Sequence, residues 1–201
     1  LVNRATQGLY PPGSTFKILT ALEYIRVNPL TYQNYSFDCN GRFTSGEDTI
    51  RCFHGTKHGK VDFTTSFAKS CNSSFANMGL TLSRTSFEDT LSSLYFNQSL
   101  PVDLTTNISK VSIGTSSSDS DLIQTVIGQG TTQMTPLHLS MITSMIANHG
   151  IMMQPYIIDR VESADGNLIK SFSPDSLGQL ISEEEADILK NLMIAVVQEG
   201  T

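Results

Sequence analysis

Apolar side chains recur around most of the circumference of the segment that follows Pro11-Pro12-Gly13. Its apolar positions are Phe16, Ile18, Leu19, Ala21, Leu22 and Ile25. A helix that is apolar nearly all round is usually central and buried. The prolines and the glycine interrupt any regular structure before this segment, and Asn28-Pro29 ends it, because the residue before a proline disfavours the helical conformation. The pattern therefore predicts a buried helix from Ser14 to Val27.

The segments on either side of this helix have weaker patterns. Residues 1–9 show no periodicity and predict an extended lead-in. Between residues 31 and 60, aromatic residues, threonine and glycine alternate with charged residues, a texture typical of short strands. The predicted strands lie at Phe37, Arg42-Phe43 and 49–53, with a turn at 45–48.

Three helices are predicted between residues 64 and 95 from capping residues and apolar stripes. Their starts are expected at Thr64 or Thr65, just after Ser70-Cys71-Asn72, and at Ser86. Asp89 lies three residues after Ser86, a spacing that resembles a capping box.

A polar stretch from Asn97 to Asp121, rich in serine and threonine, predicts a long surface loop within one domain. Thr135-Pro136 then predicts a helix start, because proline is favoured at the first helical position. This helix carries an apolar stripe and is expected to stop at Gly150, since glycine commonly follows the last helical residue.

The last third of the chain predicts a hairpin and a final helix. Strands at Tyr156-Ile157-Ile158 and Leu168-Ile169 flank Asp165-Gly166, a dipeptide typical of tight hairpin turns. Ser182 and Glu185 have the spacing of a capping box, and the apolar stripe that follows predicts a helix ending near Gly200.

Composition and charge indicate which classes of protein fit the chain and which do not. The chain has 201 residues, of which 39% are hydrophobic and 16% charged, which is typical of a soluble globular domain with a full core. A net charge of −6 without any basic run argues against a nucleic-acid surface. No apolar run reaches the length of a bilayer span. Because the chain begins without methionine and ends directly after a predicted helix, we expect it to be part of a longer protein, with any anchor outside it.

Three cysteines leave two interpretations open. Cys39 and Cys52 bracket a short glycine-containing segment and could form a disulfide in an oxidising compartment. His54 and His58 follow, so a metal site is the rival interpretation. Cys-x-His-x-x-x-His lacks the Cys-x-x-Cys unit of a structural zinc site, and the sequence therefore favours a disulfide or free thiols and predicts no metal. Cys71 is expected to pack inward.

The pattern Ser-x-x-Lys occurs twice, as Ser14/Lys17 and as Ser66/Lys69. Residues at i and i+3 share one face of a helix, so the serine hydroxyl and the lysine amine can touch. The first pair opens a buried helix, whose unpaired N–H groups favour negative charge on Ser14 and disfavour positive charge on Lys17. A lowered lysine pKa would suit a general base. For the second pair we expect a purely structural role.

Ser70-Cys71-Asn72 is the only Ser-x-Asn triplet in the chain. Together with Ser14-Thr15-Phe16-Lys17 it resembles the first and second active-site motifs of penicillin-binding proteins and serine β-lactamases. Further matches resemble class B penicillin-binding proteins and extend the likeness over essentially all 201 residues. They are Asn3-Arg4-Ala5, Gly8 to Gly13, Cys39 with Cys52, His58-Gly59, Ala68-Lys69, and Ile127-Gly128-Gln129-Gly130 running into Thr135-Pro136-Leu137.

The resemblance implies a helix-rich α+β transpeptidase fold and a D,D-transpeptidase that cross-links peptidoglycan on the outer face of the bacterial cell membrane. It implies that neutral Lys17 deprotonates Ser14, which attacks a terminal D-Ala–D-Ala bond. Ser70 would pass a proton to the leaving D-alanine, and Asn72 would hold the backbone of the stem peptide. The Ser14 N–H would form half of an oxyanion hole. The implied partners are stem peptides, β-lactams and the cell-wall machinery, and no cofactor is implied.

One departure from the family limits this picture. The third motif of the family, Lys-Thr-Gly or a relative, does not occur, and Lys57-His58-Gly59 stands on the wrong side of Ser70. In the family that motif follows the helix expected after Ser182, so we expect a single, truncated domain over residues 1–201 that lacks much of its central sheet. By itself such a chain should be acylated poorly.

Two other functions remain open. A β-lactam-sensing or non-catalytic penicillin-binding domain can share both motifs. A serine β-lactamase would need a deacylating carboxylate, for which the 97–121 segment offers Asp103, Asp119 and Asp121 but no glutamate.

Overall fold

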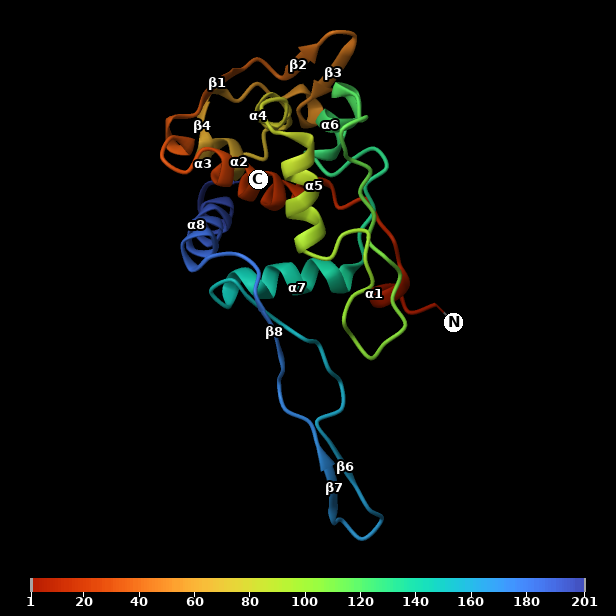
Figure 1. Ribbon diagram of the computed structural model, residues 1–201. Helices are drawn as coiled ribbons and strands as arrows, with labels where there is room; N and C mark the ends of the chain where they lie inside the picture. The colour runs from red at the N-terminus through yellow and green to blue at the C-terminus, as the bar shows by residue number, and fades with distance from the viewer. Residues whose placement is uncertain (1, 201) are drawn as a thin grey trace.

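The computed structural model describes residues 2–200 (Figure 1). The helices are α1 (Arg4–Gln7), α2 (Lys17–Val27), α3 (Phe63–Ala68), α4 (Asn72–Gly79), α5 (Arg84–Ser93), α6 (Asp119–Thr125), α7 (Pro136–Ala147) and α8 (Glu183–Glu199). Three 3₁₀ turns are η1 (Gly13–Phe16), η2 (Tyr32–Asn34) and η3 (Phe53–Gly55). The described strands form antiparallel pairs, β1 (Ser36–Cys39) with β4 (Gly59–Asp62), β2 (Arg42–Ser45) with β3 (Asp48–Arg51), β5 (Ile151–Met153) with β8 (Ser176–Gln179), and β6 (Arg160–Glu162) with β7 (Leu168–Ser171).

Helix α2 is the centre of the core, as its sequence predicts. It packs against α4, α5 and α8, and the ring of Phe16 at its start meets the rings of Phe87 and Phe96 edge-on. The predicted start at Ser14 is confirmed, with the first turn wound as the tighter η1. The helix also buries polar groups: the carboxylate of Glu23 is fully buried and accepts hydrogen bonds of 2.6 Å each from the hydroxyls of Ser86 and Thr90.

The paired strands β1–β4 and β2–β3 lie at one end of the molecule beside α4 (Figure 1). The predicted strands at Phe37 and Arg42-Phe43 are confirmed, with a tight turn between β2 and β3 at Gly46. The strand predicted at 49–53 is confirmed only as far as Arg51, because Phe53 begins η3. Strand β4 was not predicted, because its residues Gly59 to Asp62 carry only one buried apolar side chain, Val61. Strands β1, β2 and β3 contact α4, which begins at Asn72.

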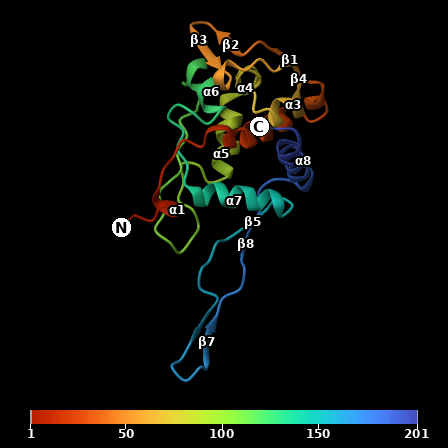
Figure 2. The same ribbon diagram turned by 180° about the vertical axis from the view of Figure 1, so that it is seen from behind.

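The hairpin β6–β7 extends away from the body of the molecule, seen from both sides in Figures 1 and 2. The predicted turn is confirmed, since Gly166 adopts a left-handed φ of +81° and its N–H donates to the carbonyl of Ser163. The predicted first strand is displaced, because the pairing begins at Arg160 and not at residues 156–158. The pair β5–β8 that joins the hairpin to α7 was not predicted.

Two predicted helix starts are wrong because a neighbouring residue supplies the cap. Helix α3 is capped by Asp62, whose carboxylate accepts the N–H of Thr65 at 2.7 Å, so Thr64 and Thr65 lie inside the helix. Helix α5 is capped by Ser83, which places Ser86 within its first turn.

Two further segments are more helical than the sequence predicts. Residues 4–7 of the expected extended lead-in form α1, capped by Asn3, and Leu1 lies outside the described residues. The expected loop ends early, because Ser118 and Asp121 form a capping box that starts α6. In both cases the helix is short and begins at a polar N-cap residue, whereas the predictions relied on apolar periodicity.

The starts of the two long C-terminal helices are confirmed. Thr135 caps α7 with Pro136 at its first position. Ser182 and Glu185 exchange the two hydrogen bonds of a capping box, at 3.1 Å and 2.7 Å. Glu185 also binds Arg26 of α2 with an Nε–Oε1 distance of 2.7 Å, so the cap of α8 is tied to the central helix.

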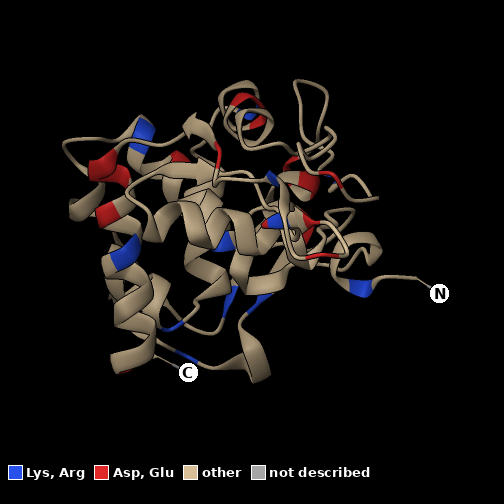
Figure 3. Ribbon diagram, turned by 90° about the horizontal axis from the view of Figure 1, so that it is seen from below, with Lys and Arg blue, Asp and Glu red and all other residues tan. Residues whose placement is uncertain are grey.

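Basic and acidic residues are interspersed along the fold and do not form one basic face (Figure 3). None of the helices among residues 2–200 is long and apolar enough to cross a membrane.

Candidate active site

Ser14 lies in η1 at the entry to α2, one turn before Lys17. Ser14 is an exposed residue, whereas Lys17 is only 2% exposed. The Lys17 Nζ donates a hydrogen bond of 3.1 Å to the Ser14 Oγ. The i, i+3 spacing therefore brings the amine against the hydroxyl, as the helical geometry requires.

The second half of the site comes from the junction of α3 and α4. Ser70 adopts a left-handed φ of +50°, which is uncommon for a residue other than glycine and turns the chain sharply between the two helices. The Lys17 Nζ lies 2.8 Å from the Ser70 Oγ, 2.9 Å from the Ser70 carbonyl oxygen and 2.7 Å from the Asn72 Oδ1. The Asn72 amide in turn donates to the carbonyl of Arg51 at 3.0 Å, which fixes its orientation.

The three polar atoms at the centre form a closed triangle. The Ser70 Oγ lies 2.8 Å from the Ser14 Oγ, and each hydroxyl contacts the Lys17 amine. A proton can therefore pass between Ser14 and Lys17 directly or through Ser70 without any movement of heavy atoms. Such a constellation, a hydroxyl activated by an adjacent base, is that of nucleophilic catalysis.

Because Lys17 is buried, its amine holds a proton less tightly than the amine of a surface lysine does. Desolvation lowers the pKa of Lys17 to about 8, against a smaller opposing electrostatic effect of Cys71 and Cys52. The ring of Phe75 lies 5.5 Å from the Nζ and contributes to its apolar surroundings. A substantial fraction of Lys17 is therefore neutral near pH 8 and able to accept a proton.

The backbone at Gly128 packs against the turn that carries Ser14. Gly128 has a φ of +69°, and its carbonyl accepts the N–H of Gly13 at 2.9 Å. A β-carbon on Gly128 would lie 2.2 Å from the Gly13 carbonyl oxygen and 2.7 Å from the Phe16 Cβ. The close approach of these two backbones therefore requires glycine at position 128.

Ser14 opens onto two clefts. One, of about 440 Å³, is lined by Ser14, Phe53, Thr56, His58, Lys69, Ser70, Asn72, Ile127 and Gln129. The other, of about 310 Å³, lies toward α8 and is lined by Ser14, Thr15, Lys17, Ile18, Phe67, Ser70, Met193 and Val196. An extended ligand can thus reach Ser14 from either side.

The structure brings together all four residues that the sequence singled out: Ser14, Lys17, Ser70 and Asn72. The second Ser-x-x-Lys pair is different, since Ser66 is fully buried and accepts a hydrogen bond from Ser74. Sequence reasoning missed the Arg51 carbonyl, because a backbone acceptor leaves no trace in the residue type.

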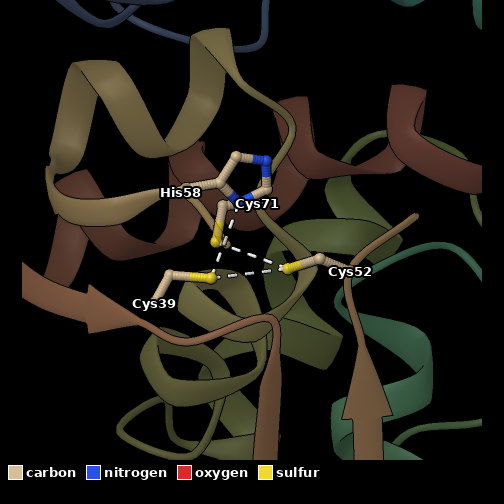
Figure 4. A group of neighbouring side chains, drawn as sticks. All are labelled: Cys39, Cys52, His58 and Cys71. Atoms are coloured by element: carbon tan, nitrogen blue, oxygen red, sulfur yellow. Dashed lines mark hydrogen bonds between the residues drawn. The ribbon is translucent and has the colours of Figure 1, made fainter. Parts of the chain in front are cut away.

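Cys39, Cys52 and Cys71 are free cysteines, and the Sγ atoms of Cys39 and Cys52 lie 3.6 Å apart (Figure 4). Cys71 is fully buried, which confirms that it packs inward.

A family model, curated proteins and solved structures all resemble this chain. The family model described as "Penicillin binding protein transpeptidase domain" matches residues 1–201. The chain is 27% identical to the peptidoglycan D,D-transpeptidase PbpA of Mycolicibacterium smegmatis, over 98% of this chain and 41% of that protein. It is 26% identical to the peptidoglycan D,D-transpeptidase MrdA of Acinetobacter baumannii, over 100% and 31%.

Solved structures give the same result. The imipenem acyl-enzyme complex of penicillin-binding protein A from M. tuberculosis superposes with a TM-score of 0.88 at 25% identity, over 98% of this chain and 46% of that one. The D,D-transpeptidase domain of a peptidoglycan glycosyltransferase from Eggerthella lenta gives 0.88 at 28% identity, over 100% and 51%. The chain thus spans less than half the length of the curated relatives cited here and about half of these structures. The helix-rich α+β fold predicted from sequence is confirmed as part of the fold of these proteins.

Proposed function

Because the chain belongs to the penicillin-binding protein transpeptidase domain family, in its class B branch, we propose that it forms the nucleophile-bearing part of a peptidoglycan D,D-transpeptidase. The observation that carries the proposal is the contact triangle of Ser14, Lys17 and Ser70 at distances of 2.8 to 3.1 Å. The triangle supplies a nucleophile, a buried base and a second hydroxyl that can relay a proton.

The first half-reaction forms an acyl-enzyme. Neutral Lys17 takes the hydroxyl proton of Ser14 while the Ser14 Oγ attacks the carbonyl carbon of the terminal D-Ala–D-Ala peptide bond. As the C–N bond breaks, the proton held by Lys17 passes through the Ser70 hydroxyl to the departing nitrogen, and D-alanine leaves. The Ser14 backbone N–H, at the N-terminal end of the helix, supplies one donor to the oxyanion.

The second half-reaction transfers the acyl group. An amine of a neighbouring stem peptide attacks the ester carbon and gives a proton to Lys17. As the bond between the ester carbon and the Ser14 Oγ breaks, Lys17 returns that proton to the Oγ and the Ser14 hydroxyl is regenerated. Asn72 stands beside the cleft with its side chain fixed by Lys17 and by the Arg51 carbonyl, and we assign it to the backbone of the donor peptide. A β-lactam mimics the dipeptide and acylates the same serine.

The remaining parts of the site belong to the complete domain in this proposal. A strand bearing Lys-Thr-Gly or a relative would supply the second oxyanion donor and would lie along the cleft between Ser14 and α8, next to Val196. The complete protein would act on the outer face of the cell membrane together with other cell-wall enzymes.

The β-lactamase alternative finds little support in the geometry. Among the described residues that line the two clefts at Ser14, none carries a carboxylate. Asp119 pairs with Arg84, and Asp121 caps α6. These carboxylates are therefore engaged structurally.

The function is tested by two measurements on the full-length protein. We expect a fluorescent penicillin to give an adduct that persists for many minutes, and a D-Ala–D-Ala stem peptide with an acceptor amine to release D-alanine and yield cross-linked product. A Ser14→Ala variant should do neither. Rapid loss of the adduct would indicate a β-lactamase, and a stable adduct without D-alanine release would indicate a sensor; either result overturns the proposal.

A further inference from the structure

A cleft with three cationic side chains lies beside the hairpin β2–β3, and we call it the basic cleft. Its volume is about 400 Å³, and it is lined by Asn40, Gly41, Arg42, Arg51, Gly55 and Lys57. None of these residues is acidic, although the whole chain has a net charge of −6. None of the ion pairs among residues 2–200 involves Arg42, Arg51 or Lys57. The basic cleft therefore gathers positive charge that the described residues do not neutralise.

The two arginines stand directly opposite each other. Arg42 and Arg51 are partners in the antiparallel register of β2 and β3, and both are exposed. The next pair, Phe43 and Ile50, points to the other face of the hairpin and packs into the core, as the alternation of side chains along strands requires. Like charges directly opposite each other destabilise a strand pair. The fold thus holds two like charges together, an arrangement that a bound anion stabilises.

A close contact between two glycines brings in the third cation. Gly41 has a left-handed φ of +96°, and a β-carbon there would lie 2.5 Å from the Gly55 carbonyl oxygen. Glycine at position 41 therefore lets the η3 segment approach the hairpin closely. Lys57, two residues after Gly55, lies in the same cleft as the two arginines for this reason. The three cations come from three separate segments.

The loop of residues 53–58 separates the basic cleft from the cleft at Ser14. Phe53 and Thr56 line the Ser14 cleft, whereas Gly55 and Lys57 line the basic cleft. Two or three extended peptide residues span about 7–10 Å, which is enough to pass over one chain segment. A peptide that reacts with Ser14 can therefore place an anionic group in the basic cleft.

A hydrogen bond couples the two clefts as well. Asn72, which lines the Ser14 cleft, donates from its side-chain amide to the Arg51 carbonyl at 3.0 Å. The residue assigned to the donor peptide backbone is thus held by the same residue whose guanidinium lines the basic cleft.

We propose that Arg42, Arg51 and Lys57 bind a carboxylate of the donor stem peptide, on the part that precedes D-Ala–D-Ala. The planar guanidinium group matches a carboxylate with two parallel hydrogen bonds, and a lysine adds a flexible point charge. The basic cleft is then a specificity element that favours stem peptides with a free carboxylate over amidated ones. It does not touch the reacting atoms. This assignment rests on the proposed function.

The test compares two synthetic stem peptides on the full-length protein, with D-alanine release as the readout. They differ only in a carboxylate or a carboxamide on the second residue before D-Ala–D-Ala. We expect kcat/KM to be about tenfold higher for the carboxylate peptide, the effect of charge-assisted hydrogen bonds. In Arg42→Gln and Arg51→Gln this preference should shrink to within about threefold, while kcat/KM for the carboxamide peptide stays unchanged.

The matched control is Lys60→Gln. Lys60 is an exposed cation on the neighbouring strand β4, outside the basic cleft, so its loss changes the net charge equally and should keep the preference. Equal kcat/KM values for the two peptides in the wild-type protein would overturn the proposal. So would a full preference in both arginine variants.

Penicillin labelling separates a failure of this inference from a failure of the proposed function. Penicillin G does not carry the additional peptide residues, so both arginine variants should be labelled at the wild-type rate. A wild-type protein that is never labelled would refute the proposed function. Normal labelling without any preference between the two peptides would refute the basic cleft alone.

Two further measurements distinguish binding from a structural role. Arg42→Gln should keep or raise the melting temperature, because it removes a repulsion across the hairpin. In the wild-type protein the preference for the carboxylate peptide should fall in about 1 M salt, where the Debye length is about 3 Å. A lowered melting temperature, or a preference that salt leaves unchanged, would contradict the assignment.

Discussion

Replacing Lys17 with methionine is expected to slow the acylation of Ser14 by penicillin by a factor on the order of 10²–10⁴, the usual contribution of a positioned general base. Methionine keeps the length of the stem in a site where Lys17 is 2% exposed, so the fold should survive. The measurement is the second-order acylation rate of the full-length protein with a fluorescent penicillin.

The control for this substitution is Lys190→Met on α8, where the lysine is exposed and the rate should not change. A Lys17→Met rate within tenfold of the wild type would show that Lys17 is not the base, provided that the melting temperature of the variant is preserved.

The pH profile of the same reaction separates a catalytic role of Lys17 from a structural one. Burial lowers the pKa of Lys17 to about 8, with Cys71 and Cys52 acting in the opposite direction. Only the neutral amine accepts a proton, so the acylation rate should rise with pH and level off above about 8. In Lys17→Met this rise should vanish. The same rising limb in both proteins would assign it to another group.

Gly128→Ala is expected to destabilise the fold strongly and to disturb Ser14. A left-handed φ costs an L-residue about 1–2 kcal/mol, and steric overpacking adds about 1–3 kcal/mol. Both apply here, because φ is +69° and the new β-carbon would lie 2.2 Å from the Gly13 carbonyl oxygen. We expect a loss of about 2–5 kcal/mol in urea unfolding, and penicillin labelling at least tenfold slower.

The matched control isolates the steric part of this effect. Gly46 has a similar φ of +59°, but a β-carbon there would meet nothing within 4 Å. Gly46→Ala should therefore lose only about 1–2 kcal/mol and keep the labelling rate. Equal effects at the two positions would show that the contact between Gly128 and Gly13 does not position Ser14.

Sequence reasoning succeeded where the physical signal is local. The apolar surface of α2 predicts its burial without knowledge of its partners, and the capping box of Ser182 and Glu185 depends on residues three apart. It failed where two neighbouring residues could each serve as the N-cap of a helix. Ser83 and Ser86 are both plausible caps, and the choice of Ser83 places Phe87 and Leu91 in the core and Ser86 against the buried Glu23.

In the candidate site, too, the local contact could be predicted from spacing and the long-range contacts could not. Ser14 and Lys17 are one helical turn apart, and their contact follows from spacing alone. The approach of Ser70 and Asn72 spans more than 50 positions of sequence, and only the resemblance to a family predicted it.

The most direct test of the central claim, that Ser14 is the acylated nucleophile, is peptide mapping by mass spectrometry after the full-length protein has reacted with penicillin G. We expect the penicilloyl mass on the peptide that contains Ser14 and its absence from Ser14→Ala. An adduct on Ser70 or Ser66, or labelling that survives in Ser14→Ala, would contradict the claim.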